Sequence, residues 1–350
     1  MSRRTVAIVG ASGYAGGEFL RLALGHPCLE VIQVTSRSNS RMPVHLVHPN
    51  LRSVTDLRFA HPDDLASADV IVSALPHGET SGRLPELVAR LSSDRGILVD
   101  LSSDFRLADP SAYRNEYLDD HPRPELLGTF VYGLPELYRG ELRSARRIAG
   151  AGCIATATIL ALYPAVRSGL VDHGRDVVIE AKIGSSAAGS TPGPSSHHAE
   201  RSGAVRTYAP TRHRHLAEVR QALPEAPPLH MTATAVERVR GVLVTAHLWL
   251  TPGVGEDQVL AAMRAAYDDE PFVRLVRAMR GNYRVPDPRI LDGTNFCDVG
   301  FAVDEDSGRL VTMAALDNLV KGTAGHAMQS LNLALGLPEG TGLGFTGLHP

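Results

Sequence analysis

The stretch Thr5-Val-Ala-Ile-Val-Gly10-Ala-Ser-Gly13-Tyr-Ala-Gly16 decides how the first part of this chain folds. Its apolar beginning predicts a short strand over residues 5–9, followed by a turn over 10–16 and a helix from Gly17 to about Leu24. A second strand is predicted over residues 31–35, which completes a βαβ unit. Glycines in such a turn let the backbone approach a pyrophosphate at the start of the helix, so the unit predicts nucleotide binding.

Further strand-like runs at 69–75 and 96–101, each followed by polar turn residues, extend this pattern into a parallel sheet. From residue 176 onward the strands become longer and lack regular intervening helices. They are predicted over residues 177–183, 231–239, 242–250, 295–303 and 310–315. This pattern favours a mostly antiparallel sheet with helices on one face, including a helix over residues 256–268.

A chain of 350 residues exceeds the usual single-core size of about 250–300 residues, so two domains are expected. The predicted class is α/β, with a Rossmann-type, doubly wound parallel sheet over residues 1–152 and an α+β domain with a mostly antiparallel sheet over 153–320. A final amphipathic helix is predicted over residues 321–335, followed by a tail over 336–350 that is too rich in Gly and Pro to hold a fixed element. This C-terminal segment, 321–350, is expected to join the first domain.

The composition narrows the kinds of partner that this chain can have. Its net charge of −3 is spread along the chain, which provides no basic face for nucleic acid and no polybasic anchor for a membrane. Three widely spaced cysteines form neither a disulfide framework nor a zinc knuckle, which fits a reducing compartment. No apolar run reaches about 18 residues, so a cytoplasmic protein that binds small molecules is predicted.

The end of the second predicted strand indicates which dinucleotide binds. An NAD site uses an acidic residue here to bind the ribose, whereas this chain has Thr35-Ser36-Arg37-Ser38, whose cation and hydroxyls suit a 2′-phosphate. NADP(H) is therefore the predicted cofactor; a solvated arginine at a strand end is the alternative. The residues predicted to bind it are Gly10, Ser12, Gly13, Tyr14, Ala15, Gly16, Ser36, Arg37, Ser38 and, by its backbone beside the nicotinamide, Pro76.

Cys153 follows the strand-like run Arg147-Ile-Ala-Gly-Ala-Gly152 at the predicted start of a helix. Peptide dipoles and N–H groups at a helix N-terminus favour a thiolate and can bind an oxyanion beside it. Cys153 is therefore the predicted nucleophile, and a buried structural cysteine is the alternative. That alternative is the expectation for Cys28 and Cys297, which lie outside such a junction.

The pair His213 and His215 provides a candidate acid/base. In an extended segment alternate side chains point the same way, so both imidazoles could face one cleft. His215, just before a predicted helix, is the first choice as proton carrier and His213 the second; two solvated imidazoles are the alternative. His197 and His198 lie in a polar loop over 184–203, but the four histidines lack the i, i+4 helical spacing of zinc proteases, and no metal is predicted.

Arg106 closes the run Asp100-Leu-Ser-Ser-Asp104-Phe-Arg106, at the edge of the parallel sheet where ligands bind. Its guanidinium could bind a carboxylate or phosphate of a substrate. Neutralisation of Arg106 by Asp104 is the alternative.

Several motifs follow one another along nearly the whole chain. They are Val9-Gly-Ala-Ser-Gly-Tyr-Ala-Gly16, Thr35-Ser-Arg-Ser-Asn39, Ala74-Leu-Pro-His-Gly78, Asp100-Leu-Ser-Ser-Asp-Phe-Arg-Leu107, Val131-Tyr-Gly-Leu-Pro-Glu136, Gly152-Cys153, His213-Arg-His215 and Asn318-Leu-Val-Lys-Gly-Thr-Ala-Gly325. Together they resemble the N-acetyl-gamma-glutamyl-phosphate reductases and their relatives in lysine biosynthesis, within the aspartate-semialdehyde-dehydrogenase-like superfamily. The resemblance implies Cys153 as nucleophile, His215 as acid/base and NADPH as hydride donor. The other contacts that it implies are with substrate by Arg106, His213, Arg214 and Tyr208, and with cofactor by Asn318.

Two departures from the arginine-pathway pattern favour the lysine-biosynthesis branch. The chain has Cys153-Ile-Ala-Thr156 where arginine-pathway members typically have Cys-Tyr-Pro-Thr, and its loop over 184–201 resembles the lysine branch. That branch reduces a 2-aminoadipyl 6-phosphate, or a glutamyl 5-phosphate, whose amino group is attached to a small acidic carrier protein. The arginines that would suit docking of an acidic carrier, or would otherwise be solvated, are Arg201, Arg206, Arg212 and Arg214.

The predicted function is the NADPH-dependent reduction of an acyl phosphate to a semialdehyde through a cysteine thioester, in amino-acid biosynthesis. The alternatives are N-acetyl-gamma-glutamyl-phosphate reduction, aspartate-semialdehyde dehydrogenation and a non-catalytic NADP-binding sensor. The family and the exposed face of an antiparallel sheet predict a homodimer or homotetramer.

Overall fold

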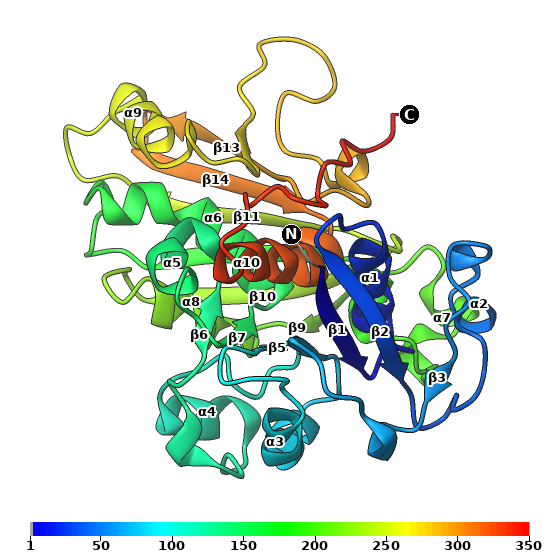
Figure 1. The fold of residues 1–350 in the computed structure, drawn as a ribbon. Coiled ribbons are helices and arrows are strands. Elements are labelled where there is room, and N and C mark those ends of the chain that lie inside the picture. Colours follow the sequence, from blue (N-terminus) through cyan, green and yellow to red (C-terminus); the bar gives the residue numbers. More distant parts are fainter. Residues whose placement is uncertain (1–2, 350) are drawn as a thin grey trace. The chain divides into compact units, whose positions relative to one another are not determined.

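The computed structural model describes residues 3–349, whose contacts divide the chain into two units (Figure 1). The first unit contains the chain up to Ala151 together with Thr323–Gly344. The second contains Gly152–Gly322 and the segment from Phe345 onward.

The first unit is built on a seven-stranded sheet in which every neighbouring pair of strands is parallel. Its strand order is β3-β2-β1-β4-β5-β7-β6. The strands are β1 (Arg4–Val9), β2 (Leu29–Thr35), β3 (Phe59–Ala60), β4 (Val70–Ser73), β5 (Ile97–Asp100), β6 (Val131–Gly133) and β7 (Arg147–Gly150). The chain order reverses at β1, which lies between β2 and β4, and such switch points form the ligand-binding edge of doubly wound sheets. The predicted parallel sheet is confirmed.

Helices accompany this sheet along the chain. They are α1 (Tyr14–Leu24), α2 (Val44–Val47), α3 (Glu79–Ala89), α4 (Pro110–Tyr117), α5 (Pro135–Leu142) and α10 (Gly325–Ala334), with short 3-10 turns at Pro49–Leu51, Pro62–Asp64 and Pro124–Leu126. Every residue of β4 and β5 is buried, as expected for a parallel sheet that is covered on both faces. Helix α1 begins directly after Gly13, three residues earlier than the sequence indicates.

Helix α10 differs from the expected amphipathic helix. All its residues are buried, and its polar side chains bond inside the unit: His326 Nε2 accepts the Ala151 N–H at 2.9 Å. The helix ends at Ala334 because Gly336 adopts a φ of 71°, the left-handed conformation that closes many helices. The helix therefore ends one residue before the predicted end at Leu335. Of the segment 321–350 that was expected to join the first domain, Thr323–Gly344 lies in the first unit and residues 345–349 lie in the second.

The second unit contains a seven-stranded mixed sheet with the order β12-β13-β14-β11-β8-β10-β9. Its strands are β8 (Val177–Ile183), β9 (Val205–Ala209), β10 (Leu229–Val236), β11 (Val242–Trp249), β12 (Val273–Leu275), β13 (Cys297–Asp304) and β14 (Arg309–Leu316). The β8–β10 and β12–β13 pairs are parallel and the other four pairs are antiparallel. The predicted mostly antiparallel sheet is confirmed.

One face of this sheet is covered by helices. Helix α6 (Cys153–Arg167) packs against β11 and β14, and α9 (Glu256–Tyr267) packs against α6. The remaining helices are α7 (His198–Arg201), α8 (His215–Ala222) and 3-10 turns at Ser185–Ala188, Pro194–Ser196 and Pro288–Leu291. A π-helical turn at Val320–Ala324 begins in this unit, which it leaves after Gly322. On β8 and β11 buried residues alternate with exposed or half-buried ones, so the second face of the sheet is partly open.

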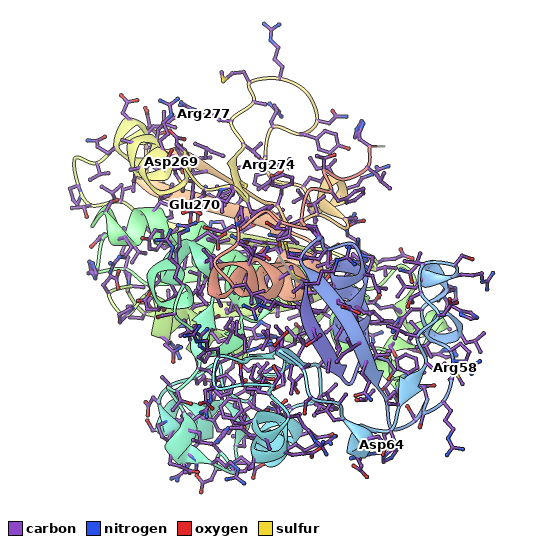
Figure 2. The ribbon with its side chains drawn as sticks, viewed as in Figure 1. Arg58, Asp64, Asp269, Glu270, Arg274 and Arg277 are labelled. Carbon is purple, nitrogen blue, oxygen red and sulfur yellow. The ribbon has the colours of Figure 1, made fainter. Side chains whose placement is uncertain are left out.

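Some charged side chains pair at the surface of the second unit. Figure 2 labels Arg274, which lies on β12, and Arg277, which follows it. Arg277 pairs with the Glu256 carboxylate at 2.8 Å, and Arg274 donates to the buried Asp298 at 2.6 Å. Along the described chain, no helix is both long and apolar enough to cross a membrane.

Gly10 is a position where the first unit requires glycine. Its φ of 78° is left-handed, and a Cβ added there would lie 2.7 Å from the Ala74 carbonyl oxygen, at the end of the neighbouring strand β4. Gly16, the third residue of α1, is equally confined, since its added Cβ would lie 2.7 Å from the Gly10 carbonyl oxygen. The turn and helix α1 therefore approach strand β4 more closely than side chains would permit.

Gly10→Ala should destabilise the protein by about 1–3 kcal/mol, because it combines a left-handed alanine with a backbone clash. The free energy of unfolding, measured with denaturant, tests this expectation. Gly82→Ala is the matched control: Gly82 lies in α3 with no atom within 4 Å of an added Cβ, and should be neutral or stabilised by up to about 1 kcal/mol. Equal stabilities of the two variants would contradict the steric argument.

Candidate active site

Cys153 is the first residue of α6, as predicted from the strand-to-helix junction. Strand β7 ends at Gly150, and Gly152 is the N-cap residue, which brings no side chain to accept the N–H groups of the first turn. The first turn contains no acidic residue and the last turn contains Arg167, so the positive end of the helix dipole acts on the half-buried thiol without a local counter-charge from the helix itself. Cys297 is buried in β13, and the three cysteines form no disulfide.

His215 and Glu218 enclose the residue before the thiol. Glu218 is 1% exposed and its Oε2 accepts the Gly152 N–H at 2.8 Å, while its Oε1 lies 3.9 Å from His215 Nε2. A Cβ added to Gly152 would lie 2.6 Å from His215 Nε2. Glycine at position 152 thus lets the imidazole pack against the backbone that carries Cys153.

Glu218 is a residue of this site that the sequence analysis missed. The signal was present, because residues i and i+3 of a helix lie on one face and His215 begins α8. What the sequence did not indicate is that this face turns toward the start of α6.

His213 lies beside His215, but not through the extended backbone that was expected. Arg214 has helical φ and ψ angles of −54° and −29°, and the two imidazole rings meet edge to face with centroids 4.6 Å apart. The His215 backbone N–H donates to His213 Nδ1 at 3.2 Å. Burial, and then the charge of Arg214, lower the pKa of His213 to about 4, so this ring is neutral near pH 7. An imidazole with so low a pKa is a weak base, which makes His213 a poor acceptor for the Cys153 proton.

The π-helical turn at Val320–Ala324 approaches the thiol from another direction. A Cβ added to Gly322 would lie 2.7 Å from the Cys153 Cβ and 3.2 Å from its Cα. Gly322 therefore limits where the Cys153 side chain can lie.

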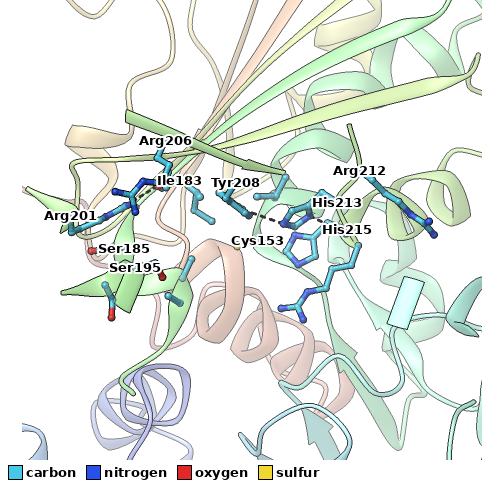
Figure 3. A pocket seen from close by; sticks show the side chains of 17 residues that line it. Cys153, Ile183, Ser185, Ser195, Arg201, Arg206, Tyr208, Arg212, His213 and His215 are labelled. Atoms are coloured by element: carbon cyan, nitrogen blue, oxygen red, sulfur yellow. Dashed lines mark hydrogen bonds between the residues drawn. The ribbon is translucent and has the colours of Figure 1, made fainter. Parts of the chain in front are cut away.

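These residues line a pocket of about 510 Å³ that lies wholly within the second unit (Figure 3). Its wall includes Cys153, Ser185, Ser195, Tyr208, His213 and His215. The pocket brings together five residues that the sequence analysis assigned to catalysis or to substrate binding. They are Cys153, Tyr208, His213, His215 and the exposed Arg214. The polar loop over 184–203 contributes another side of the pocket through short helical turns.

The four arginines of the expected carrier-docking group all line this pocket, but they differ in what they bond. Arg201 donates to the Val236 carbonyl at 2.6 Å and so ties the loop to strand β10. Arg206 donates to the backbone of Glu200 at 3.0 Å and pairs with its carboxylate at 3.4 Å. Arg212 and Arg214 are exposed.

Arg106 lies in the first unit, where its Nε donates to the Gly150 carbonyl at 2.9 Å. Asp104, expected as an alternative partner of Arg106, bonds elsewhere: its carboxylate accepts from Gly78 N at 2.7 Å and Ser81 N at 2.8 Å and lies 3.0 Å from His77 Nδ1. Burial opposes ionisation of Asp104, but these bonds outweigh it and lower the pKa of Asp104. Neutralisation of Arg106 by Asp104 is therefore wrong.

The glycine turn of the first unit fits a dinucleotide. Gly13 is the N-cap of α1 and leaves the N-terminal N–H groups of the helix without a capping side chain. Ser36, buried at the end of β2, bonds the Ser12 hydroxyl at 2.8 Å, and the next two residues, Arg37 and Ser38, are exposed. A small-residue turn, a bare helix start and a cation at the end of β2 are what a phosphorylated dinucleotide requires.

Asn318 has a different environment. It is 1% exposed in the second unit, where its amide oxygen accepts the Gly241 N–H at 2.7 Å and its amide nitrogen donates to the Ser186 hydroxyl at 2.9 Å. These bonds hold the turn at Ser185–Ala188, part of which lines the pocket. The expected cofactor contact of Asn318 remains a prediction.

Comparison with known proteins identifies the family to which the two parts of this chain are similar. Residues 5–145 match the family model "Semialdehyde dehydrogenase, NAD binding domain", and residues 153–318 match "Semialdehyde dehydrogenase, dimerisation domain". The solved aspartate semialdehyde dehydrogenase II of Vibrio cholerae superposes with a TM-score of 0.70 at 14% identity, over 96% of this chain and 99% of that one. The predicted fold and the nicotinamide-dinucleotide-binding domain are confirmed.

Two relatives match over nearly their whole length. The "[LysW]-L-2-aminoadipate 6-phosphate reductase" of Deinococcus radiodurans is 55% identical over 99% of both chains. The "[LysW]-L-2-aminoadipate/[LysW]-L-glutamate phosphate reductase" of Saccharolobus solfataricus is 42% identical over 99% of this chain and 98% of that one. The chain belongs to the semialdehyde dehydrogenase family, a family of oxidoreductases, and groups there with these phosphate reductases.

Proposed function

We propose that this protein reduces an acyl phosphate to a semialdehyde through a thioester on Cys153, with NADPH as reductant. The acyl group is that of 2-aminoadipyl 6-phosphate, or glutamyl 5-phosphate, attached through its amino group to a small carrier protein. The observation that carries the proposal is the position of Cys153, which begins α6 inside a pocket that also holds His215 and exposed arginine side chains.

The first step is acyl transfer to sulfur. The Cys153 thiol gives its proton to His215, and the sulfur attacks the acyl-phosphate carbonyl, forming a carbon–sulfur bond and a tetrahedral oxyanion. N–H groups at the start of α6 stabilise that oxyanion. When the oxyanion collapses, the bond from carbon to the phosphate oxygen breaks, and phosphate leaves a thioester on Cys153.

The second step releases the aldehyde. Bound NADPH supplies the hydride that reduces the thioester carbon. The resulting oxyanion on that carbon re-forms a carbonyl, the carbon–sulfur bond breaks, and the semialdehyde departs while His215 returns its proton to the sulfur. The covalent bond to Cys153 keeps the acyl group in place between the two steps, so reduction requires no second encounter.

Glu218 is a positioning residue in this scheme. An imidazolium formed on His215 would face the Glu218 carboxylate 3.9 Å away. The same carboxylate fixes the Gly152 N–H at 2.8 Å, so one buried side chain ties the proton carrier to the backbone of the nucleophile. The close contact of Gly152 with His215 supports this arrangement.

Two features support the carrier-linked substrate. The names of the relatives from Deinococcus radiodurans and Saccharolobus solfataricus specify LysW-linked substrates, and these chains align end to end with this one. Arg212 and Arg214 are exposed at the pocket, where positive charge would attract an acidic carrier. Arg106, which bonds the end of β7, is the proposed further substrate contact.

NADP(H) is the proposed form of the dinucleotide, because Arg37 and Ser38 are exposed after β2 and no acidic residue stands there. The turn residues Ser12 and Tyr14 to Gly16, with Pro76 in the loop after β4, are the proposed remaining contacts.

A homo-oligomer is proposed through the open face of the second sheet. Val178 on β8 is 41% exposed, and its register partner His247 on β11 is half-buried on the same face. The match of residues 153–318 to a dimerisation domain supports a contact made by this part of the chain.

Trapping the acyl-enzyme tests the substrate and the nucleophile together. Enzyme mixed with carrier-linked aminoadipyl phosphate but no NADPH should gain, at Cys153, the mass of the carrier-linked acyl group; N-acetylglutamyl phosphate should add far less. Mass spectrometry of the quenched protein gives the result. Cys153→Ala should gain no mass and lose at least about 10³-fold in turnover. An adduct only from the acetylated substrate would contradict the carrier proposal, and an unlabelled thiol would contradict the mechanism.

The two histidines should differ in their effect on rate. His215→Asn should lower kcat by about 10²–10⁴-fold, because it removes the proton carrier. His213→Asn should lower kcat by less than about 10-fold, since a ring whose pKa is lowered to about 4 is a weak base near pH 7. Steady-state kinetics of both variants measures this. The reverse order would assign the acid/base role to His213.

Gly322→Ala should displace the thiol, because the added methyl would lie 2.7 Å from the Cys153 Cβ. We expect kcat to fall by about 10²-fold with little change in NADPH binding. Gly140→Ala, at a helical glycine with no atom within 4 Å of an added Cβ, is the matched control and should retain full activity. Wild-type kcat in Gly322→Ala would show that the π-helical turn does not constrain the nucleophile.

A further inference from the structure

Tyr208 occupies an irregular position in the second sheet. It lies on the edge strand β9, where the pairing with β10 shifts between Ala233 and Thr234: Ala209 pairs with Ala233 and Thr207 with Thr234. Tyr208 is therefore the extra residue of a β-bulge. Bulges frequently redirect a side chain next to an active site. Here the redirected phenol forms part of the wall of the Cys153 pocket (Figure 3).

The hydrogen bonds around His213 have a fixed direction. A backbone N–H can only donate, so the bond from His215 N at 3.2 Å makes His213 Nδ1 an acceptor. In a neutral ring the single proton must then sit on Nε2. His213 Nε2 lies 3.3 Å from the Tyr208 hydroxyl, so His213 donates and the phenol oxygen accepts.

Because the phenol oxygen accepts from His213, the hydroxyl proton of Tyr208 is available for a different acceptor. The phenol bonds no other protein group among residues 3–349, and 48% of the side chain is exposed to the pocket and its solvent. Burial, and then the charge of Cys153, raise the pKa of Tyr208 to about 12, so the phenol keeps its proton over the whole working pH range. Tyr208 and Cys153 line the same pocket, so a substrate bound to the sulfur lies in the cavity that the phenol faces.

We propose that the Tyr208 hydroxyl is a catalytic hydrogen-bond donor to the oxyanion that forms on the carbon bonded to Cys153. The inference rests on the proposed thioester chemistry and adds a side-chain donor to the N–H groups of α6. His213 acts as a positioning residue: it accepts from the backbone, donates to the phenol oxygen and so turns the phenol proton toward the ligand. The bulge turns the Tyr208 side chain toward the pocket. The two hydrogen bonds of His213 make the phenol oxygen an acceptor from His213 and leave its proton as a donor.

Tyr208→Phe removes only the hydroxyl and tests the proposal. We assay phosphate-dependent oxidation of the carrier-linked semialdehyde by NADP⁺, which passes through the same oxyanions in reverse. We expect kcat to fall by about 10²-fold while the KM for phosphate changes less than about twofold, since the lost donor acts on a transition state. The rate of Cys153 alkylation by iodoacetamide should stay within about twofold of wild type, because the nucleophile is untouched.

Tyr283→Phe is the matched control, since Tyr283 lies outside the pocket with its ring next to His349. It should behave as wild type. A Tyr208→Phe variant with unchanged kcat would overturn the inference, and so would one whose only defect is a raised KM for phosphate, which would place the donor on the phosphate. If the wild-type protein oxidised no carrier-linked semialdehyde, the proposed function itself would fail, and the two failures are thereby distinguished.

Discussion

The arrangement of the candidate active site in the second unit depends on close packing of other segments around the start of α6. Glu218 accepts the Gly152 N–H at 2.8 Å, and His215 Nε2 would lie 2.6 Å from a side-chain carbon at position 152. Gly322 approaches Cys153 from the π-helical turn as closely. Glycine is therefore required at positions 152 and 322. A larger residue at either position would push His215, Glu218 or the π-helical turn away from Cys153.

The electrostatics of this site combine a fixed positive field with one buried negative charge. The dipole of α6 and the exposed arginines favour negative charge at the thiol and on the oxyanion beside it. The Glu218 carboxylate lies next to His215, where it would stabilise an imidazolium formed on the proposed proton carrier. Burial, and then the charge of Arg214, lower the pKa of His213 and make it a weak base. Its ring nitrogens bond the His215 backbone and the Tyr208 hydroxyl.

The first unit provides a rigid binding edge by a different means. The backbone of Gly10 leaves no room for a side chain beside the Ala74 carbonyl, and the buried carboxylates of Asp100 and Asp104 accept from backbone N–H groups after the neighbouring strands. Asp104 holds the start of α3 through two N–H groups, whereas burial, and then the nearby Asp104 charge, raise the pKa of Asp100 to about 6. The loops that follow β4 and β5 are therefore fixed by internal bonds, as a preorganised dinucleotide site requires.

The sequence alone determined those features that depend on local patterns. Apolar runs and glycine spacing were enough to predict the parallel sheet, the longer strands of the second unit and the helix start at Cys153, because strand and helix periodicity is a short-range property. It did not determine that β10 and β11, adjacent in sequence, are separated by β8, nor that α10 is buried on all sides. It also missed Glu218, the bulge at Tyr208 and the helical bend at Arg214. Those depend on which faces meet after the chain has folded, and only tertiary packing fixes contacts between residues so distant along the chain.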